Sequence, residues 1–361
     1  MTDCAVSMEN LCMTTAIHSG SDDSKVAVIL PVYRTAAYLP KCLESLLQQK
    51  HQNFVVFAVN DGSPDDSELI LEKYARRDDR IKIIRQVNGG LSSARNTALD
   101  IVEQRGDFDY VAYVDSDDYV APEYLSSMLS FAKAQTSDLV VCGYKSFNDK
   151  VEPWSLPFYS GTQLEKEDFI SLVFGVEAFN ANGKGGMVWK FLIAADTARG
   201  LRFERDRSVL EDEPYCFKLV KAAKKIAYLK ESLYYYRSSD GSLSKAKDFG
   251  SKIIKARSIC LAEARDLSPY IYNLTLSKLV NVLLRELKKG HPLPENFRLA
   301  DYENDMRQGL KSGLISKRRF AAYQLFLRLP RLSKLYVLLW KSTRPFSRGK
   351  WRSYFGIKKH G

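Results

Sequence analysis

The sequence contains no long hydrophobic run. A helix that crosses a bilayer needs at least about 18 consecutive apolar residues, and the most apolar stretch near the C-terminus, residues 335–340, is far shorter. We therefore expect a chain that does not span a membrane.

Paired cysteines and a leader segment are absent as well. The six cysteines are scattered along 361 residues without a CxxC pair, and the chain does not open on a basic segment followed by an apolar one. These absences argue against a disulfide-stapled secreted protein and predict a reducing, cytoplasmic setting. The hydrophobic content of 45% is ordinary for a packed protein, and the length allows two domains or one large domain with an extension.

Acidic residues are missing from the last part of the chain. Residues 306–361 contain fifteen Lys and Arg and no Asp or Glu, which leaves 39 basic and 43 acidic residues in the first 305. The formal net charge of +11 is therefore a property of the C-terminal segment. An acidic partner would meet this segment and not the body of the protein.

Strand-like and helix-like segments alternate between residues 25 and 144. The hydrophobic pattern predicts strands at 25–33, 54–60, 81–85, 110–114 and 138–144, and helices at 38–49, 68–77, 91–105 and 122–134. Strands that alternate with helices of this length predict an α/β fold with a Rossmann-like, mostly parallel, doubly wound sheet. Such a sheet binds ligands at the carboxyl ends of its strands.

Residues 108–120, FDYVAYVDSDDYV, form the stretch around which we expect a site. A run of strand formers ends here in three carboxylates, Asp115, Asp117 and Asp118. Like charges this close repel one another, and a divalent cation with oxygen ligands would relieve the repulsion. The plainer alternative is an acidic turn that caps the helix predicted near Pro122, since Asp is a common N-cap residue.

Distinctive residues also end the preceding strands. The first strand ends in Pro31 and Tyr33, whose ring could stack on a planar base, and the second runs into Asp61 and Gly62. Asp61 could accept hydrogen bonds from a base, although NDGSPD is also a good β-turn. After the third strand, a Gly-rich turn leads into a helix whose N-terminus and Arg95 could meet an anion. Because such polar and Gly-rich segments follow several successive strands, they indicate a ligand site.

Four segments together resemble a known family. PVYRTAAYLPKCLESLLQQ, VNDGSPDDS, NGGLSSARN and YVDSDDYV, in this order and spacing, are similar to family 2 glycosyltransferases with a GT-A fold. The resemblance is dense over residues 26–144 and thinner up to residue 244. It implies a nucleotide-diphosphate sugar donor, usually a uridine one, a divalent cation (Mn²⁺ or Mg²⁺) and inversion at the anomeric carbon.

The resemblance also implies roles for individual residues. On the donor side it places Pro31, Tyr33, Asp61, Arg95, Asp115, Arg237 and Ser242. Tyr33 and Asp61 would contact the base, and Asp115 the nucleoside. Asp117 would hold the metal ion on the diphosphate, with Arg95 near the base or phosphates. Arg34 stands where the family often has Asn, a difference that bears on donor preference.

The second half of the chain should supply the acceptor side and the catalytic base. Inverting transfer needs a carboxylate that removes the proton of the acceptor hydroxyl, and Asp212 resembles the Asp of the family's Glu-Asp motif. The alternative is a helix start that favours negative charge. Trp189 and Lys190 resemble an acceptor-side Trp-x-Lys region less closely, and Trp189 fits a core position equally well.

Arg237 and Ser242 lie in a segment that resembles the family's Tyr-Arg segment. There they could close over the diphosphate, but a Tyr-rich strand with an exposed Arg explains this segment equally well.

The chain divides into four predicted parts. These are a mobile N-terminal tail (1–24), a GT-A domain (25–247) with a nucleotide-sugar half (25–145) and an acceptor half (146–247), a helical extension (248–305) and a basic amphipathic tail (306–361). Aromatic and leucine residues interleave the basic residues of this tail, a pattern typical of segments that lie on an anionic membrane surface. The alternative is that residues 320–340 pack on the body as a helical hairpin.

The leading functional hypothesis is an enzyme at the inner face of a membrane. It would transfer a sugar from a nucleotide donor to a hydroxyl of a saccharide, lipid-linked in our expectation, during cell-surface polysaccharide synthesis. Nucleotidyl transfer is disfavoured because the first strand lacks a Gly-rich loop with Arg and Lys for a triphosphate. A catalytically silent basic module that binds membrane or nucleic acid is the non-enzyme alternative. The tail has no zinc-binding, helix-turn-helix or RNP-like pattern, so we expect no nucleic-acid partner.

Overall fold

The computed structural model describes residues 23–148, 150–154, 160–173, 187–205, 210–237, 249–289, 298–311, 313 and 315–328. Nearly all of the N-terminal tail predicted for residues 1–24 lies outside these ranges, as do Ser242 and residues 329–361 of the predicted basic tail. The strands are β1 (Val26–Val32), β2 (Phe54–Asn60), β3 (Ile81–Arg85), β4 (Tyr110–Tyr113), β5 (Tyr119–Val120), β6 (Leu139–Asn148), β7 (Lys150–Trp154), β8 (Thr162–Leu164), β9 (Phe191–Ala194) and β10 (Ile226–Arg237).

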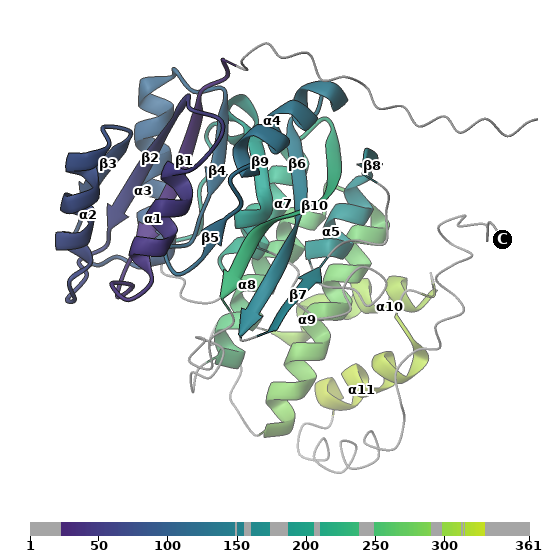
Figure 1. Cartoon of the computed structure of the whole chain (residues 1–361). Helices are drawn as coiled ribbons and strands as arrows, with labels where there is room; N and C mark the ends of the chain where they lie inside the picture. The colour runs from purple at the N-terminus through teal and green to yellow at the C-terminus, as the bar shows by residue number, and fades with distance from the viewer. Residues whose placement is uncertain are drawn as a thin grey trace, which may run out of the picture.

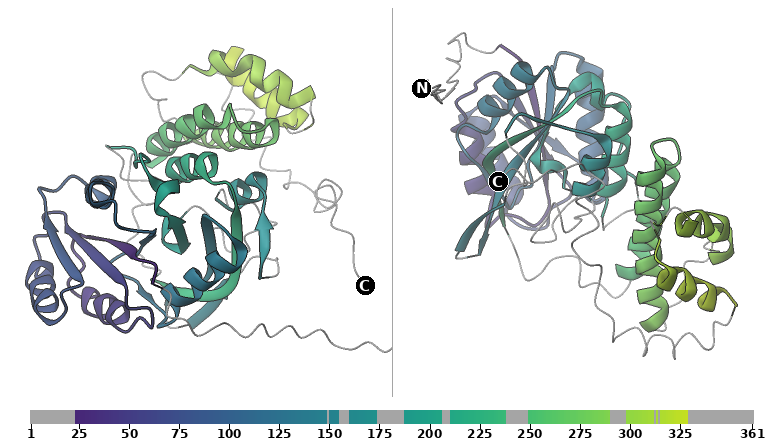
Figure 2. Two further views of the ribbon diagram at one scale, coloured as in Figure 1. Left: turned by 90° about the horizontal axis from the view of Figure 1, so that it is seen from above. Right: turned by 90° about the vertical axis from the view of Figure 1, so that its right-hand side faces the viewer.

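Helices flank this sheet on both sides and extend beyond it (Figures 1 and 2). They are α1 (Leu39–Leu47), α2 (Ser67–Arg77), α3 (Leu91–Arg105), α4 (Tyr124–Gln135), α5 (Lys166–Val173), α6 (Ala195–Ala198), α7 (Asp212–Ala222), α8 (Phe249–Ala264), α9 (Pro269–Lys289), α10 (Glu303–Lys311) and α11 (Lys317–Arg328), with short 3-10 turns at Val188–Lys190 and Leu299–Tyr302. The elements predicted between residues 25 and 144 all form, with ends within a few residues of those expected.

All described strands belong to one sheet with the order β3-β2-β1-β4-β9-β6-β10-β5, in which β7 pairs with β6 and β8 with β10. Within the described ranges, six strands (β1 to β4, β6 and β10) run in one direction, and β5, β7, β8 and β9 run the opposite way. The predicted Rossmann-like, mostly parallel α/β fold is therefore confirmed.

Strand β1 forms the centre of the first half of the sheet. All seven of its residues are buried, and Val26 lies opposite Phe54 of β2 on one side and Tyr110 of β4 on the other. A strand that is apolar on both faces needs cover on both, and helices on the two sides of the sheet provide it. Because β1, β2 and β4 are parallel, their carboxyl ends meet at one edge.

Helix α3 begins at that carboxyl edge and packs on β1 and β2. Ala94 and Ala98 are fully buried, and their small side chains allow the helix to lie close to the strands. Gly90 precedes the helix with φ +84°, and Gly106 ends it with φ +65°, a left-handed conformation that glycine adopts without steric cost. The first turns of α3 thereby bring Arg95 and Asn96 to the edge where the site is expected.

Helices α8 to α11 form a second packed unit beside the sheet domain (Figure 2). Ile254 on α8, Leu279 on α9, Met306 on α10 and Tyr323 on α11 are buried together in a hydrophobic cluster of their own. The helical extension predicted from residue 248 is therefore present.

The structure places the end of this unit differently from the predicted boundary at residue 305. Helix α10 runs through that boundary, and Tyr323 of α11 is only 1% exposed. The described part of the predicted basic tail, as far as Arg328, thus follows the packed-helix alternative, because Met306 and Tyr323 bury apolar surface against α8 and α9. In the described part of the chain, no helix is both long enough and apolar enough to cross a membrane.

Candidate active site

Tyr33 and Arg34 follow β1 at the carboxyl edge. Pro31 is buried within β1, whereas Tyr33 is 42% exposed and Arg34 lies beside its ring, with 5.4 Å from the guanidinium carbon to the ring centroid. Arg34 has φ +56°, a left-handed conformation that Asn and Gly adopt more readily than Arg. The contact of Tyr33 with a base stays a prediction.

Asp61 follows β2 and fixes the Gly-rich turn. Its carboxylate is buried and accepts hydrogen bonds from the backbone N–H groups of Gly89 and Gly90, both at 2.8 Å, and from Gln86 Nε2 at 2.6 Å. Gly62, with φ +65°, leaves only 3.0 Å between an added Cβ and Asn88 N, so a larger residue would not fit. Asp61 therefore shapes the start of α3, and its predicted contact with a base stays a prediction.

Arg95 joins three carboxylates that come from distant parts of the chain. Its guanidinium is 1% exposed; Nη2 donates to Asp115 Oδ1 at 2.9 Å, and Nη1 donates to Asp212 Oδ1 at 2.6 Å and to Glu211 Oε1 at 3.2 Å. Burial disfavours the charged guanidinium, but the charges of Asp212, Asp115 and Glu211 raise the pKa of Arg95 above its ordinary value. Asp115 follows β4, and Glu211 and Asp212 begin α7, so one side chain ties the two halves of the domain together.

Asp212 is held in place at both carboxylate oxygens. While Oδ1 accepts from Arg95, Oδ2 accepts from the backbone N–H of Val188 at 3.1 Å. Asp212 makes these contacts instead of capping α7 with its side chain. Leu210, two residues before Asp212, has φ +56°, a backbone conformation that is strained for a branched side chain. Its place in the first turn of α7 also agrees with the helix-start alternative, and the role of Asp212 as the base stays a prediction.

Burial raises the pKa of Asp212 to about 7, against the opposing charge of Arg95 and with support from the charges of Glu211 and Asp115. Three carboxylates share one guanidinium, so they cannot all be neutralised by it. A carboxyl group that titrates near neutral pH can accept a proton from a weakly acidic hydroxyl more readily than an ordinary Asp.

The acidic turn after β4 is tied to the end of β10. Tyr234 donates its hydroxyl proton to Asp118 Oδ2 at 2.7 Å and accepts from the backbone N–H of Asp115 at 3.0 Å. The backbone N–H of Arg237 donates to Asp118 Oδ1 at 2.6 Å, and its Nε donates to the carbonyl of Asp117 at 2.9 Å. Helix α4 starts at Tyr124 with Glu123 at its N-cap. The alternative in which this acidic turn caps α4 is therefore wrong.

Asp117 is the residue predicted to hold a metal ion. Burial and the nearby charge of Asp115 raise the pKa of Asp117 to about 6, so its surroundings disfavour the bare charge. Within the described ranges, no group of three metal-ligating side chains comes together. Mg²⁺ is commonly bound by one or two carboxylates together with substrate phosphates and waters. A metal ion at Asp117, held together with a donor diphosphate, therefore stays a prediction.

Trp189 and Lys190 lie in the core. Trp189 is 1% exposed and stacks on Tyr234 at 4.2 Å and on Tyr236 at 5.4 Å between ring centroids. Lys190 is fully buried, and burial lowers its pKa to about 8. Trp189 thus occupies a core position, the alternative given for it from the sequence. Neither the Trp189 nor the Lys190 side chain is exposed to an acceptor in this structure. Ser242 lies outside the described residues.

Two contributors to this site were not assigned a role from the sequence. Glu211, the residue before the predicted base Asp212, is the third partner of Arg95. Tyr234 lies in the Tyr-rich segment already noted, but the order of its three tyrosines does not show which one points at Asp118.

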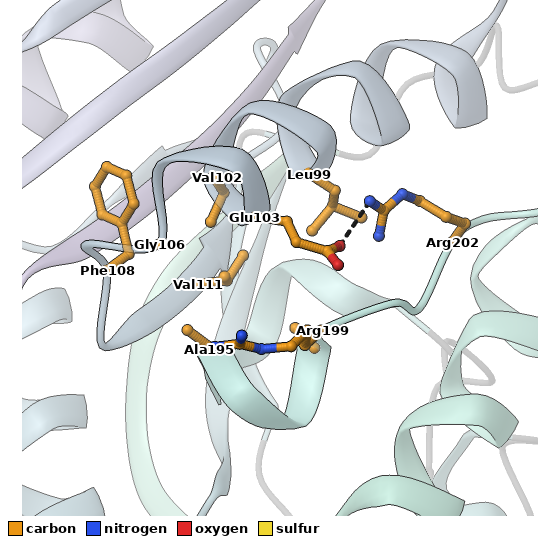
Figure 3. A pocket seen from close by; sticks show the side chains of 10 residues that line it. Leu99, Val102, Glu103, Gly106, Phe108, Val111, Ala195, Arg199 and Arg202 are labelled. Carbon is orange, nitrogen blue, oxygen red and sulfur yellow. Dashed lines mark hydrogen bonds and ion pairs between the residues drawn. The ribbon is translucent and has the colours of Figure 1, made fainter.

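A cavity of about 30 Å³ opens elsewhere, between α3, β4 and α6 (Figure 3). Phe108, Val111 and Ala195 line it at the amino end of β4, whereas Asp115 follows the carboxyl end. Sites for molecules of nucleotide size are commonly about 300–1,000 Å³, so this cavity is not the donor site.

The sheet order, the acidic turn after β4 and the held carboxylate at the start of α7 are together the arrangement expected of a GT-A glycosyltransferase. Residues 27–193 match the sequence profile described as Glycosyl transferase family 2, and this part of the chain belongs to that family.

Similar proteins come from bacterial sources. The chain is 34% identical over 225 residues to the glycosyltransferase EpsJ of Bacillus subtilis (strain 168), which covers 61% of this chain and 62% of EpsJ. It is 28% identical over 234 residues to the minor teichoic acid biosynthesis protein GgaB of the same organism, covering 60% of this chain and 23% of GgaB. The chain thus spans less than two thirds of the length of these relatives.

A solved structure shares the fold over most of the chain. The crystal structure of S. aureus TarS 1–349 in complex with UDP-GlcNAc matches with a TM-score of 0.65 and 19% identity, covering 90% of this chain and 95% of that one. At this level of identity the likeness shows the fold alone.

Replacing Arg95 should destabilise the folded protein, because it leaves the buried carboxylates around it without a positive partner. At pH 8 we expect Arg95→Met to lower the free energy of unfolding by about 3–5 kcal/mol, the cost of leaving buried charges without their partner. At about pH 6 the loss should be smaller, because burial raises the pKa of Asp212 and Arg95 lowers it, so that without Arg95 this carboxyl takes up a proton at higher pH and loses its charge. Urea unfolding at both pH values measures this.

Arg202→Met is the matched control, because Arg202 also pairs with two carboxylates but is 30% exposed. We expect it to cost at most about 1 kcal/mol. Equal losses for the two variants, or a loss for Arg95→Met that does not change with pH, would contradict the role given to Arg95.

Proposed function

We propose that this protein is an inverting glycosyltransferase that moves a sugar from a nucleotide-diphosphate sugar to a hydroxyl of a saccharide. The observation that carries the proposal is the Arg95 cluster, in which Asp115 of the expected donor side and Asp212 of the expected base are bound to one guanidinium at 2.9 and 2.6 Å. A donor and a catalytic carboxylate must lie in a fixed relation for in-line displacement, and this cluster supplies it.

Asp212 is the proposed base. In its ionised form it takes the proton of the acceptor hydroxyl as that oxygen forms a bond to the anomeric carbon. The bond from the anomeric carbon to the diphosphate oxygen breaks on the opposite face, and its electron pair leaves with the nucleotide diphosphate. The configuration at the anomeric carbon is therefore inverted. A pKa of about 7 lets Asp212 be ionised at neutral pH and still accept a proton effectively.

The proposed donor is a uridine-diphosphate sugar. The exposed Tyr33 and the buried Asp61 lie at the ends of adjacent strands where the base would sit, and the TarS structure that shares this fold was solved with UDP-GlcNAc. The relative GgaB is named for teichoic acid biosynthesis, which supports a role in cell-surface polysaccharide synthesis with a lipid-linked saccharide as acceptor.

A divalent cation, Mn²⁺ or Mg²⁺, is proposed to accompany the donor at Asp117. When bound, such an ion would neutralise negative charge on the diphosphate. Arg237 would hold the turn that carries Asp117, because its Nε already binds the Asp117 carbonyl.

Removal of the Asp117 carboxylate should separate donor binding from folding. In the wild type we expect UDP-sugars to raise the melting temperature with Mn²⁺ and to lose this effect with a chelator. Asp117→Ala should lose the Mn²⁺-dependent shift and remain folded, because burial and Asp115 already oppose the charge of Asp117, whose pKa is raised to about 6. Asp196→Ala, at an 89% exposed carboxylate, is the control. Donor affinity that is the same with and without cation in the wild type would overturn the metal proposal.

The rate of UDP release should follow the ionisation of Asp212. We expect the rate to rise with pH up to about pH 7 and then level off, because the raised pKa of Asp212 keeps it protonated below that point. Asp212→Asn should lower the rate by about 10²- to 10⁴-fold, as loss of a general base does, with donor binding kept. An unchanged rate would move the base to Glu211, which Glu211→Gln then tests.

We also propose that the protein is cytoplasmic and peripheral on the inner face of the membrane. Lys311 on α10 and Lys317, Arg318 and Arg328 on α11 are exposed on the helical unit, and nine more Lys and Arg without any acidic residue follow Arg328 in the sequence. Each such residue near an anionic leaflet contributes about 1 kcal/mol. Charge of this size is enough to hold a protein at a surface that carries a lipid-linked acceptor.

The membrane proposal predicts binding that depends on lipid charge. The full chain should sediment with vesicles that contain phosphatidylserine but not with phosphatidylcholine alone, and high salt should release it. A chain truncated after Arg328 keeps α8 to α11 and should lose most vesicle binding while retaining UDP release. Salt-insensitive binding to neutral vesicles, or unchanged binding after truncation, would contradict the proposal.

A further inference from the structure

Asn96 holds the backbone of a distant loop. It lies next to Arg95 on α3 and is 4% exposed. Its Nδ2 donates to the carbonyl of Phe203 at 2.8 Å, and its Oδ1 accepts the N–H of Phe203 at 2.8 Å. One amide side chain therefore satisfies both polar backbone groups of a buried residue that is 107 positions away in the sequence.

Phe203 in turn contacts the helix that carries the proposed base. Its ring stacks on Tyr215 of α7 with 3.9 Å between centroids and 9° between planes. Tyr215 lies three residues after Asp212 and shares a hydrogen bond of 2.8 Å with the hydroxyl of Tyr113 on β4. The guanidinium carbon of Arg95 also lies over the Phe203 ring, 5.1 Å from its centroid. Phe203 thus packs between α3, β4 and the first turn of α7.

Salt bridges hold the same loop from outside. Arg202 donates from Nε to Asp100 Oδ1 and from Nη2 to Glu103 Oε2 on α3, both at 2.8 Å, as Figure 3 shows for Glu103. These groups are partly exposed, with side-chain accessibilities of 30% for Arg202 and 59% for Asp100. Exposed pairs of this kind contribute little energy, so the buried amide of Asn96 is the stronger restraint on Phe203.

We propose that Asn96 is a positioning residue that sets the location of the Asp212 carboxylate by fixing Phe203 against α7. This inference rests on the proposed role of Asp212 as the base. Neither Asn96 nor Phe203 touches Asp212; the effect passes through the Phe203–Tyr215 stack, while Arg95 fixes the carboxylate itself. Adjacent residues of α3 therefore hold the base in two ways, one by charge and one by packing.

The expected effect falls on the chemical step. A shift of about 1 Å in a reacting group can lower a rate by about 10²-fold without loss of binding. The donor residues Tyr33, Asp61 and Asp115 belong to other elements, and the two hydrogen bonds of Asn96 both go to Phe203. Variants at Asn96 should therefore change kcat and leave donor affinity nearly unaltered.

Two variants test the two hydrogen bonds. Asn96→Asp keeps the shape and the acceptor for the Phe203 N–H, but it places a second acceptor against the Phe203 carbonyl. Asn96→Leu removes both bonds. The matched control is Gln49→Glu, because Gln49 is 1% exposed and binds the Ala121 carbonyl at 2.7 Å and the Leu125 N–H at 2.9 Å in the same reciprocal way, away from α7.

The measurements are UDP release from a uridine-diphosphate sugar as a function of pH, donor binding by melting shift, and amide hydrogen exchange of residues 199–205 and 210–215. For both Asn96 variants we expect kcat to fall about 10- to 100-fold and donor affinity to stay within about twofold. The pH midpoint of kcat should also move, because Asp212 then lies differently relative to the charged groups around it, Arg95, Glu211, Asp115 and Lys190. Exchange should rise at the start of α7. Gln49→Glu should lower the melting temperature comparably and leave kcat and the pH midpoint of the folded protein unchanged.

The outcomes separate this inference from the proposed function. An active wild type whose Asn96 variants lose only stability, with kcat per folded molecule and pH midpoint unchanged, would overturn the positioning role. A folded wild type that releases no UDP from any uridine-diphosphate sugar would overturn the donor proposal instead, and hydrogen exchange would still report whether Asn96 fixes α7.

Discussion

The buried ion pairs of Arg95 are the constraint on which the site depends. One guanidinium, 1% exposed, faces carboxylates from the end of β4 and from the start of α7. A buried charge is tolerated only when it is paired, so the two halves of the domain must close in the arrangement that brings these groups together. Burial raises the pKa of Asp212 to about 7; Arg95 opposes this rise, and the negative charges of Glu211 and Asp115 add to it.

Other elements of the fold serve this cluster. The parallel strands β1, β2 and β4 bring their carboxyl ends to one edge, and Asp61 fixes the turn from which α3 starts. From α3, Arg95 reaches the carboxylates while Asn96 holds Phe203 against α7. Tyr234 ties the acidic turn to β10. Donor-side and base-side groups thus share Arg95 as a neighbour.

Much of this was predictable from local sequence. Periodicity located the strands and helices up to residue 144, and Asp61 and Asp115 follow the carboxyl ends of their strands as expected. The sequence did not reveal that Arg95 would turn inward to Asp212, because the ion pair joins positions 117 residues apart. Trp189 could be core or surface until its stacking on Tyr234 was seen. The packing of Tyr323 was only the alternative prediction, because the basic residues around it concealed one buried apolar face.

The central claim is that Asp115 and Asp212 are coupled through Arg95, and a double-mutant cycle tests it most directly. Urea unfolding at pH 8 would be measured for the wild type, Asp115→Asn, Asp212→Asn and the double variant. Groups that share a charged partner typically show coupling of about 0.5–3 kcal/mol, whereas independent sites add to within about 0.5 kcal/mol. The account predicts a coupling above about 1 kcal/mol that disappears in the Arg95→Met background. Additive effects in the presence of Arg95 would contradict it.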